Sequence, residues 1–136
     1  MILVISGSRT LTSYALVSEV IDEGVAELVN HMGEPLTELY SGHAKGVDVL
    51  AERWAKENGI PVKTFIPDWN IHGKKAGILR NEEMANAGDV ILAVWDGQSR
   101  GTKHMIDYAK KAKKVIFWKD AINGFGMMVD WRFHER

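Results

Sequence analysis

The chain has 136 residues and a mass of 15.2 kDa, which is the size of one compact domain. Its 17 basic and 18 acidic side chains give a formal net charge of −1, which excludes a general electrostatic attraction to nucleic acid or to an anionic membrane. The absence of cysteine excludes a disulfide scaffold, thiolate catalysis and zinc held by cysteine.

Short apolar runs alternate with helical patterns along the chain. The first run, residues 2–5, is rich in β-branched side chains and predicts a strand that is buried on both faces. Four more strands are expected, at residues 37–40, 61–66, 89–95 and 115–118. The spacing of apolar residues predicts helices at about 13–32, 47–58, 76–87 and 102–112, and a polar loop is expected over 68–75.

This alternation predicts an α/β fold, a three-layer sandwich with a mainly parallel, doubly wound sheet of about five strands. Residues 1–118 are expected to form this domain. In the tail, residues 119–136, Asn123-Gly124 indicates a turn and 127–133 is expected to add an edge strand to the same domain. Gly24 falls inside the first predicted helix, where a close contact between helix and sheet would explain it.

Three strand-to-helix turns combine glycines, hydroxyls and cations, at residues 6–9, 41–46 and 97–102. In a parallel sheet these turns lie at one edge, where such folds bind ligands. Glycine lets a backbone amide approach an anion, and a helix start adds unpaired N–H groups. One such turn is usually only a tight turn, but three at one edge favour an anion or nucleotide site. The patterns G-x-G-x-x-G and G-x-x-x-x-G-K-[ST] are absent, which disfavours a dinucleotide site and a P-loop.

The residues expected to contact the ligand come from these turns and from the helices beside them. In the turns they are Gly7, Ser8, Arg9, Ser41, Gly42, Lys45, Gly46, Gly97, Ser99, Gly101 and Thr102. Asp48 lies in the first turn of its helix, where it is either a favourable partner of the helix dipole or a ribose or catalytic contact. Arg80 and Asn81 are expected to face the same crevice, whereas Lys74 and Lys75 fit a solvated loop.

Aromatic and imidazole side chains give weaker signals. Trp69 and Trp95 are candidates for stacking on a base, although packing against the core is the commoner role of tryptophan. The spacing of His43, His72 and His104 does not match a metal site, so we expect neither a metal nor a required cofactor.

Five motifs follow one another along the chain. They are Gly7-Ser8-Arg9, Ser41-Gly42-x-Ala44-x-Gly46-x-Asp48, Asp68-Trp69, Gly73-Lys74-x-Ala76-Gly77-x-x-Arg80-Asn81-x-x-Met84 and Ser99-x-Gly101-Thr102. Their order resembles the SLOG superfamily over about residues 1–118. They are most similar to the small YspA-like, cpYpsA-related SLOG proteins, and more distantly to lonely-guy phosphoribohydrolases and Smf/DprA DNA-processing proteins. Each motif alone is weak, but five in this order are specific.

The resemblance implies a Rossmann-like domain that binds a nucleotide or a nucleotide-derived ligand, such as an ADP-ribose derivative. In lonely-guy enzymes the last turn reads P-G-G-x-G-T-x-x-E, and its glutamate takes part in cleaving an N-glycosidic bond. Here Asp96-Gly97 replaces the Pro-Gly start, and Met105 stands at the glutamate position. Hydrolase chemistry therefore does not carry over directly. Phosphate binding carries over to Gly97, Ser99, Gly101 and Thr102.

Three functions remain open from the sequence. The first is binding of a nucleoside phosphate or ADP-ribose type ligand in a phosphate cradle, as a sensor or regulator. The second is hydrolysis of the N-glycosidic bond of a nucleoside monophosphate by a relocated carboxylate. The candidates for catalysis are Asp48, Asp96 and Arg80, with Asp107 and Glu82 as further carboxylates. The third is single-stranded DNA binding through the lysines of 103–114, which equally fit a solvated helix surface.

Partners and compartment are predicted only broadly. The ligand is expected to be a small nucleotide, and association of two copies into a dimer is open because related proteins commonly pair through helices beside the site. No run of about 20 apolar residues indicates a membrane span. Residues 1–10 lack the basic start and long apolar stretch of a secretory signal, so the cytoplasm is the expected compartment.

Overall fold

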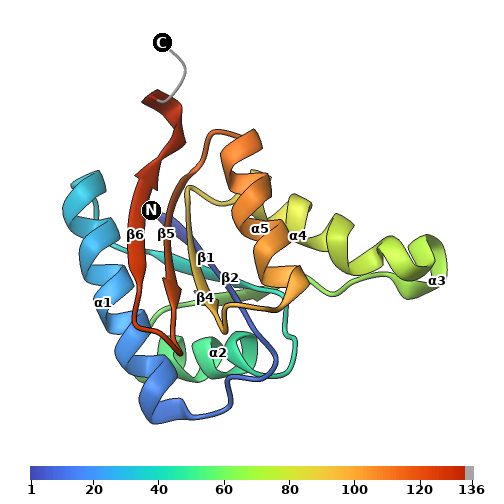
Figure 1. Ribbon diagram of the computed structural model, residues 1–136, viewed down its shortest axis with the longest axis horizontal. Helices are drawn as coiled ribbons and strands as arrows, with labels where there is room; N and C mark the ends of the chain where they lie inside the picture. The colour runs from blue at the N-terminus through green and yellow to red at the C-terminus, as the bar shows by residue number, and fades with distance from the viewer. Residues whose placement is uncertain (134–136) are drawn as a thin grey trace.

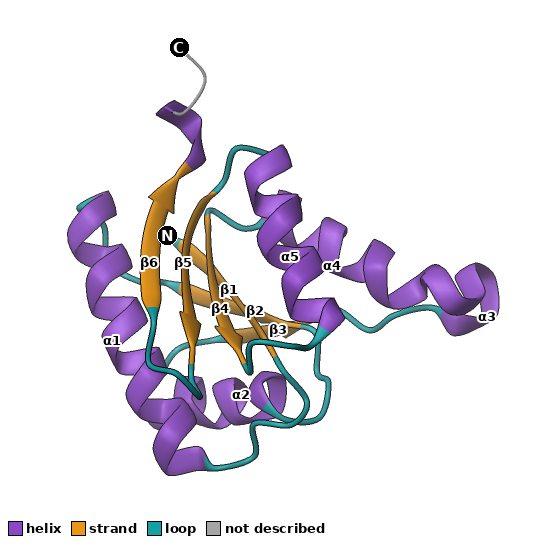
Figure 2. Cartoon of the chain, in the orientation of Figure 1, coloured by secondary structure: helices purple, strands orange, loops and turns teal. Residues whose placement is uncertain are grey.

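The computed structural model describes residues 1–133. They form one sheet of six strands between two layers of helices (Figures 1 and 2). The strands are β1 (Ile2–Gly7), β2 (Glu38–Ser41), β3 (Val62–Thr64), β4 (Val90–Trp95), β5 (Val115–Asp120) and β6 (Gly126–Asp130). Residues 134–136, the last three of the predicted tail, lie outside the described residues.

The strand order in the sheet is β3-β2-β1-β4-β5-β6. Strands β1 to β5 are parallel, and β6 pairs antiparallel with β5. This arrangement confirms the predicted α/β sandwich with a mainly parallel, doubly wound sheet, in which six strands are present where about five were expected. The unbroken apolar runs of β1 and β4 fit their central positions, because a central parallel strand is covered on both faces.

Helices cover both faces of the sheet. They are α1 (Tyr14–Met32), α2 (Val47–Glu57), α3 (Trp69–His72), α4 (Ala76–Ala87) and α5 (Arg100–Lys111), with short 3₁₀ segments at Gly73–Lys75 and Trp131–Phe133. Figure 1 shows α1 and α2 on one side of the sheet and α4 and α5 on the other, with α3 extending away from the sheet. Within residues 1–133, every helix is too short or too polar to cross a membrane.

The two faces of the sheet build two separate cores. Leu3, Ile5 and Leu92 point to the side of α1 and α2, where they pack with Val17 and Ala51. The neighbouring strand residues, such as Val4 and Ile91, point to the side of α4 and α5 and pack with Met84 and Met105. Alternate residues of each central strand therefore anchor opposite helix layers, as the two-residue period of a strand requires.

Helix α1 follows its sequence signals closely. The Ser13 hydroxyl accepts a hydrogen bond from the backbone N–H of Leu16 at 3.3 Å, and Gly33 ends the helix with φ of +68°. Gly24 lies against the sheet, because a Cβ atom there would sit 2.5 Å from Cδ1 of Leu92. The predicted close contact of helix and sheet is therefore present, and it explains a glycine in mid-helix.

Two segments differ from the sequence prediction. The expected loop at 68–75 contains α3 and a 3₁₀ turn, because the Asp68 carboxylate accepts a hydrogen bond from the backbone N–H of Ile71 at 3.1 Å and caps a helix too short to show periodicity. At the end of the chain the strand covers Gly126–Asp130, and Trp131–Phe133 turns into a 3₁₀ segment.

The connections after β1 and β4 leave in opposite directions, since β1 leads to α1 on one face and β4 to α5 on the other. Where adjacent parallel strands send their chains to opposite faces, a crevice opens beyond their carboxyl ends. The turns with the predicted ligand contacts follow β1, β2 and β4, so they come to this edge of the sheet.

Candidate functional site

A polar cavity of about 210 Å³ lies beyond the carboxyl ends of β1 and β4. It combines hydroxyls, two guanidinium groups, one carboxylate and several backbone atoms. Its lining residues are Ser6, Gly7, Ser8, Arg9, Thr10, Ala44, Asp48, Arg80, Asn81, Ser99, Gly101 and Thr102. Most of the ligand contacts predicted from the sequence therefore come together in one place, from all three glycine turns and from α4.

Three hydroxyls form a triangle of hydrogen bonds at this cavity. Ser8 Oγ lies 2.6 Å from Ser99 Oγ and 3.2 Å from Thr102 Oγ1, and Ser99 Oγ lies 3.0 Å from Thr102 Oγ1. The backbone N–H of Asp96 also donates to Ser8 Oγ at 3.0 Å, so the turn after β1 is tied to the turn after β4. Because each hydroxyl has one hydrogen that rotates freely, each group can turn this hydrogen out of the triangle and donate it to an anion.

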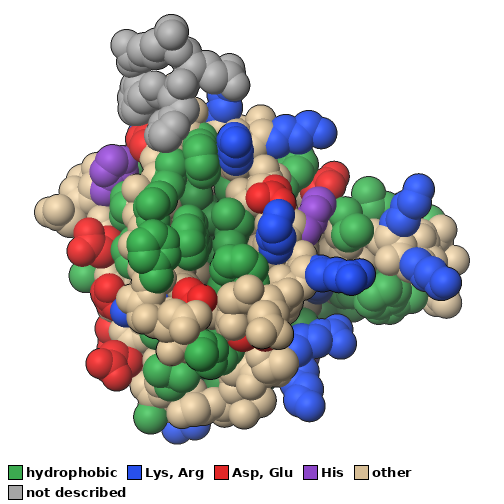
Figure 3. Space-filling model, viewed as in Figure 1, with side chains coloured by type: hydrophobic (Ala, Val, Ile, Leu, Met, Phe, Trp, Pro, Cys, Tyr) green, Lys and Arg blue, Asp and Glu red, His purple; other side chains and the backbone are tan. Residues whose placement is uncertain are grey.

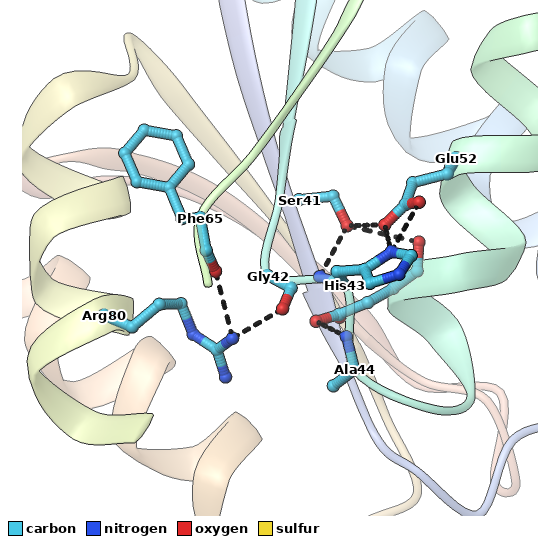
Figure 4. Close-up of polar contacts among 8 residues, drawn as sticks. Ser41, Gly42, His43, Ala44, Glu52, Phe65 and Arg80 are labelled. Carbon is cyan, nitrogen blue, oxygen red and sulfur yellow. Dashed lines mark hydrogen bonds and ion pairs between the residues drawn. The ribbon is translucent and has the colours of Figure 1, made fainter. Parts of the chain in front are cut away.

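Arg80 reaches the cavity from α4, and its guanidinium is held in place by three protein groups. Its Nη1 donates to the carbonyl oxygens of Gly42 at 2.6 Å and Phe65 at 3.3 Å (Figure 4). Its Nε donates to the side-chain oxygen of Asn81 at 2.8 Å. Burial lowers the pKa of Arg80, the Asp48 carboxylate raises it and the Arg9 guanidinium lowers it again. Arginine stays protonated in proteins, so the cavity has a fixed positive charge beside it.

Asp48 is the buried carboxylate of the cavity, with 4% of its surface exposed. Its Oδ2 accepts a hydrogen bond from the backbone N–H of Ala44 at 3.2 Å, whereas its Oδ1 finds no hydrogen-bond partner within residues 1–133. Burial raises the pKa of Asp48 to about 6, although the Ala44 amide and the Arg80 guanidinium act in the opposite direction. A buried carboxyl group that titrates near neutral pH beside a cation is typical of functional sites.

Asp96, another carboxylate that the sequence singled out for catalysis, and Met105, which stands at the glutamate position, have structural roles in this geometry. The Asp96 carboxylate accepts hydrogen bonds from the Thr10 hydroxyl at 2.7 Å and from the backbone N–H of Ser99 at 2.7 Å. Burial raises the pKa of Asp96, but these hydrogen bonds outweigh it and lower the pKa to about 2. Met105, at the glutamate position of the lonely-guy pattern, is fully buried in the core between α5 and the sheet.

With this geometry in place, the comparison with known families is informative. Residues 1–72 match the YspA, cpYpsA-related SLOG family, which is just over half of the chain. The chain belongs to this family. The match includes the turns after β1 and β2, Asp48 and the Asp68-Trp69 pair, and it ends before Arg80. The resemblance of the later segments to SLOG proteins rests on their motifs.

One relative of this SLOG protein is the gene 61 protein of Mycobacterium phage D29. It is 48% identical over 77 residues, which cover 52% of this chain and 62% of the phage protein. The match thus spans less than two thirds of the phage protein, whose name states no activity. No solved structure matches the chain significantly.

Five predicted contacts of the SLOG motifs do not line the cavity. Gly46 and Gly97 have φ of +85° and +84°, which only glycine adopts readily, and they shape the turns. Gly42 offers its carbonyl oxygen to Arg80, and Lys45 is exposed outside the cavity. Ser41 is buried behind it and donates to Glu52 Oε2 at 2.7 Å.

Several residues near the cavity were missed from the sequence. Ser6, Thr10 and Ala44 line it, and the position of Thr10 three residues after Gly7 was an available signal. The spacing of His43 does not predict a metal ligand, and the structure instead pairs it with Glu52: its Nδ1 lies 2.9 Å from Glu52 Oε1 (Figure 4). The backbone of His43 has a φ of +57°, which is uncommon outside glycine. Nothing in the spacing of His43 and Glu52 predicts this pair, because it depends on how the turn after β2 folds back on α2.

The remaining charged candidates lie elsewhere in this SLOG fold. Asp107 pairs with Lys103 at 2.8 Å on the exposed side of α5, and Glu82 lies 3.4 Å from His104 Nε2. Lys114 donates to the carbonyl oxygen of Gly88 at 2.8 Å, so part of the predicted lysine cluster is engaged within the protein. Within residues 1–133, no three His, Asp or Glu side chains are grouped closely enough to hold a metal ion.

Proposed function

We propose that this SLOG-family protein binds a nucleotide or a nucleotide-derived ligand of the nucleoside phosphate or ADP-ribose type, as a sensor or regulator. The observation that carries the proposal is the convergence of the Ser8, Ser99 and Thr102 hydroxyls with the Arg9 and Arg80 guanidinium groups on one cavity. Hydroxyl and guanidinium donors together match the several acceptor oxygens of a phosphate group.

The start of α5 adds to this preference for an anion. Ser99 is the N-cap residue of this helix, and Gly101 and Thr102 of its first turn line the cavity. The first N–H groups of a helix have no partner within the helix, and the helix dipole favours negative charge there. A Cβ atom at Gly101 would meet no atom within 4 Å, so the space in front of this backbone is open.

The role as a sensor or regulator follows from the missing catalytic group. In the lonely-guy pattern a glutamate stands where this chain has Met105, and a thioether buried in the core neither transfers a proton nor stabilises a cation. A protein that keeps the phosphate contacts without that group is suited to bind its ligand unchanged.

Isothermal titration calorimetry with AMP, ADP, NAD and ADP-ribose tests the proposal. At least one of them is expected to bind the wild type, and Ser99→Ala is expected to weaken that binding about tenfold because a donor to phosphate is lost. Ser18→Ala, which changes a half-buried serine of α1 that does not line the cavity, is the matched control and is expected to bind normally. No heat with any of the four ligands would contradict the proposal.

A second candidate function is favoured by Asp48. Its carboxyl group is buried in the same cavity, has an oxygen without a hydrogen-bond partner and has a pKa raised to about 6. Such a group can accept a proton from water as the water attacks C1′ of a nucleoside monophosphate, the bond to the base breaks and the departing base nitrogen takes up a proton from solvent. In this reaction the products are the free base and ribose 5-phosphate.

Chromatography of nucleoside monophosphates after long incubation tests this second function. Free base is expected with the wild type and not with Asp48→Asn, which keeps the shape of the side chain but does not act as a base. Absence of free base with the wild type, alongside measurable binding, would leave the protein as a binding protein only.

A further inference from the structure

A second hollow adjoins the polar cavity and has a different chemistry. Its volume is also about 210 Å³, and it shares Arg9, Ala44 and Arg80 with the cavity. Its other walls include the apolar side chains of Ile66, Pro67 and Trp69. Because three lining residues are common to both, the cavity and the hollow are two ends of one crevice, with the guanidinium groups between them.

Trp69 is the largest side chain of this hollow, and it is held while remaining open to solvent. It begins α3, whose start is fixed by the hydrogen bond from Ile71 N–H to the Asp68 carboxylate. Its ring edge rests beside α4, since a Cβ atom at Gly77 would lie 3.6 Å from Cη2 of Trp69. Even so, 54% of its surface is exposed, which is unusual for a tryptophan that packs on its own fold.

A polar wall faces these apolar groups. The His43 imidazole lines the hollow, and its Nδ1 lies 2.9 Å from Glu52 Oε1. Glu52 is held in turn by the Ser41 hydroxyl at 2.7 Å. Since a carboxylate only accepts hydrogen bonds, Nδ1 donates to it, and this fixes the orientation of the ring. The hollow thus combines an aromatic surface with an oriented hydrogen-bonding ring.

We infer that this hollow is the base-binding subsite of the crevice, in which the ring of a nucleobase stacks on Trp69. The inference rests on the proposed function, because it places the phosphate of the same ligand in the polar cavity. A nucleotide has a charged phosphate at one end and a planar aromatic base at the other; the crevice has converging hydroxyls at one end and the Trp69 ring at the other, with both guanidinium groups shared between them. Stacking of a base on an aromatic side chain tolerates any base, so Trp69 supplies affinity, and His43 contacts the polar edge of the base.

The test compares ligands with and without a base. Calorimetry is carried out with ribose 5-phosphate and with AMP, GMP, CMP and UMP, on the wild type and on Trp69→Ala, Trp69→Phe and Ile71→Ala. Trp69→Ala is expected to weaken the binding of the nucleotides tenfold or more and to leave ribose 5-phosphate unchanged, and Trp69→Phe is expected to bind within about threefold of the wild type. Ile71→Ala is the matched control, because Ile71 is an exposed apolar residue of the same helix outside the hollow.

The outcomes separate the subsite from the proposed function. If ribose 5-phosphate and the nucleotides bind the wild type and Trp69→Ala equally well, the base subsite is wrong and the phosphate site stands. If none of these ligands binds the wild type, the base subsite falls, and the proposed function falls with it when ADP, NAD and ADP-ribose also give no heat. Tryptophan fluorescence gives a second measurement: a nucleotide is expected to quench the emission of the wild type more strongly than that of Trp69→Phe, and equal quenching would overturn the stacking on Trp69.

Discussion

Helix α5 lines two concave sites of opposite chemistry, the polar cavity and a larger groove, and the difference between them indicates what marks a functional site. Through Gly101 and Thr102 it lines the polar cavity of about 210 Å³. Through Lys103, Ile106 and Lys110 it lines a larger groove of about 350 Å³ toward β5 and β6, here called the aromatic groove, whose other walls include Trp95, Trp118 and Trp131. Figure 3 shows hydrophobic side chains gathered over β5 and β6 on this face.

The aromatic groove and the polar cavity differ in how their polar groups are arranged. In the aromatic groove Lys103 pairs with Asp107, and Lys110 lies 5.8 Å from the centre of the Trp131 ring. In the polar cavity the hydroxyls converge, the Arg80 guanidinium is fixed, and a buried carboxyl oxygen has no partner among the described residues. The aromatic groove is therefore the larger and more apolar of the two, whereas only the polar cavity has oriented polar groups that converge. A phosphate site requires such convergence, so the cavity is the better candidate.

The strongest test of the cavity is to add a Cβ atom at Gly7, where the backbone lies in close contact with its neighbours. A Cβ atom at Gly7 would lie 2.5 Å from Cβ of Val47 and 2.5 Å from the carbonyl oxygen of Val94. Neither atom belongs to a flexible side-chain end, so Gly7→Ala is expected to lower the free energy of unfolding by about 3 kcal/mol and to weaken ligand binding. Denaturant unfolding measures the first effect.

Gly101→Ala is the matched control for stability, because its Cβ atom would meet nothing within 4 Å and alanine favours the helix. Its free energy of unfolding is expected to equal or exceed that of the wild type. Equal stabilities of Gly7→Ala and Gly101→Ala would show that the turn after β1 adapts freely, and would weaken the description of the cavity as preformed.

The buried carboxyl group sets the second test, through pH. The pKa of Asp48 is about 6 in the folded protein, above the usual value of about 3.9 in an unfolded chain. The folded state therefore binds the proton of Asp48 more tightly than the unfolded chain does. The resulting contribution to the free energy of unfolding is fully present below about pH 4 and is lost as the pH rises through 6. Asp48→Asn removes this loss and is expected to stabilise the protein at pH 7.5 by up to about 3 kcal/mol.

Denaturant unfolding of the wild type and Asp48→Asn at pH 4.5 and 7.5 measures this effect. The difference between the two proteins is expected to be small at pH 4.5 and large at pH 7.5. A difference that is the same at both pH values would show that Asp48 is not kept buried at a cost in stability.

The third test removes one positive charge from the polar cavity in one variant and one from the aromatic groove in another. Arg9→Ala is expected to weaken AMP binding about 10- to 100-fold, because a hydrogen bond to a charged group contributes about 1.5–3 kcal/mol. Lys110→Ala removes a charge of the same sign from the aromatic groove and is expected to leave AMP binding unchanged. Calorimetry at one fixed ionic strength compares them, and equal losses in both variants would mean that general charge, and not the cavity, attracts the ligand.

The fold was predictable because its signals are local and repeated. The caps of α1 at Ser13 and Gly33 and the apolar runs of β1 and β4 each predict the element that forms. The short helix α3 was missed because four residues are too few to show a helical period. The cap by Asp68 was the one available signal for it.

The candidate site was easiest to predict where a residue lies in or next to a strand-to-helix turn. Ser8 follows β1 directly, and Ser99 and Thr102 lie where the turn after β4 enters α5, so topology alone brings them to one edge. The roles of Asp48 and Asp96 could not be separated in the sequence, since each lies within two residues of a glycine in a strand-to-helix turn. The difference arises from tertiary hydrogen bonds, because Thr10 donates to Asp96 whereas Asp48 Oδ1 receives nothing from residues 1–133.

The smallest expected effect concerns a side-chain hydrogen bond that links the aromatic groove to the polar cavity. Trp95 lines the aromatic groove, and its Nε1 donates to the backbone carbonyl of Ser99, a residue of the polar cavity, at 2.9 Å. Trp95→Phe removes this bond and is expected to cost about 1 kcal/mol of stability and about a factor of two in AMP affinity. Trp118→Phe, which changes a tryptophan of the same groove without touching Ser99, is expected to leave the affinity unchanged. If both variants lower the affinity for AMP equally, the groove acts on the cavity through its packing as a whole. If only Trp95→Phe lowers the affinity, the hydrogen bond from Trp95 couples the groove to the cavity, because the backbone that Trp95 holds positions the Ser99 hydroxyl.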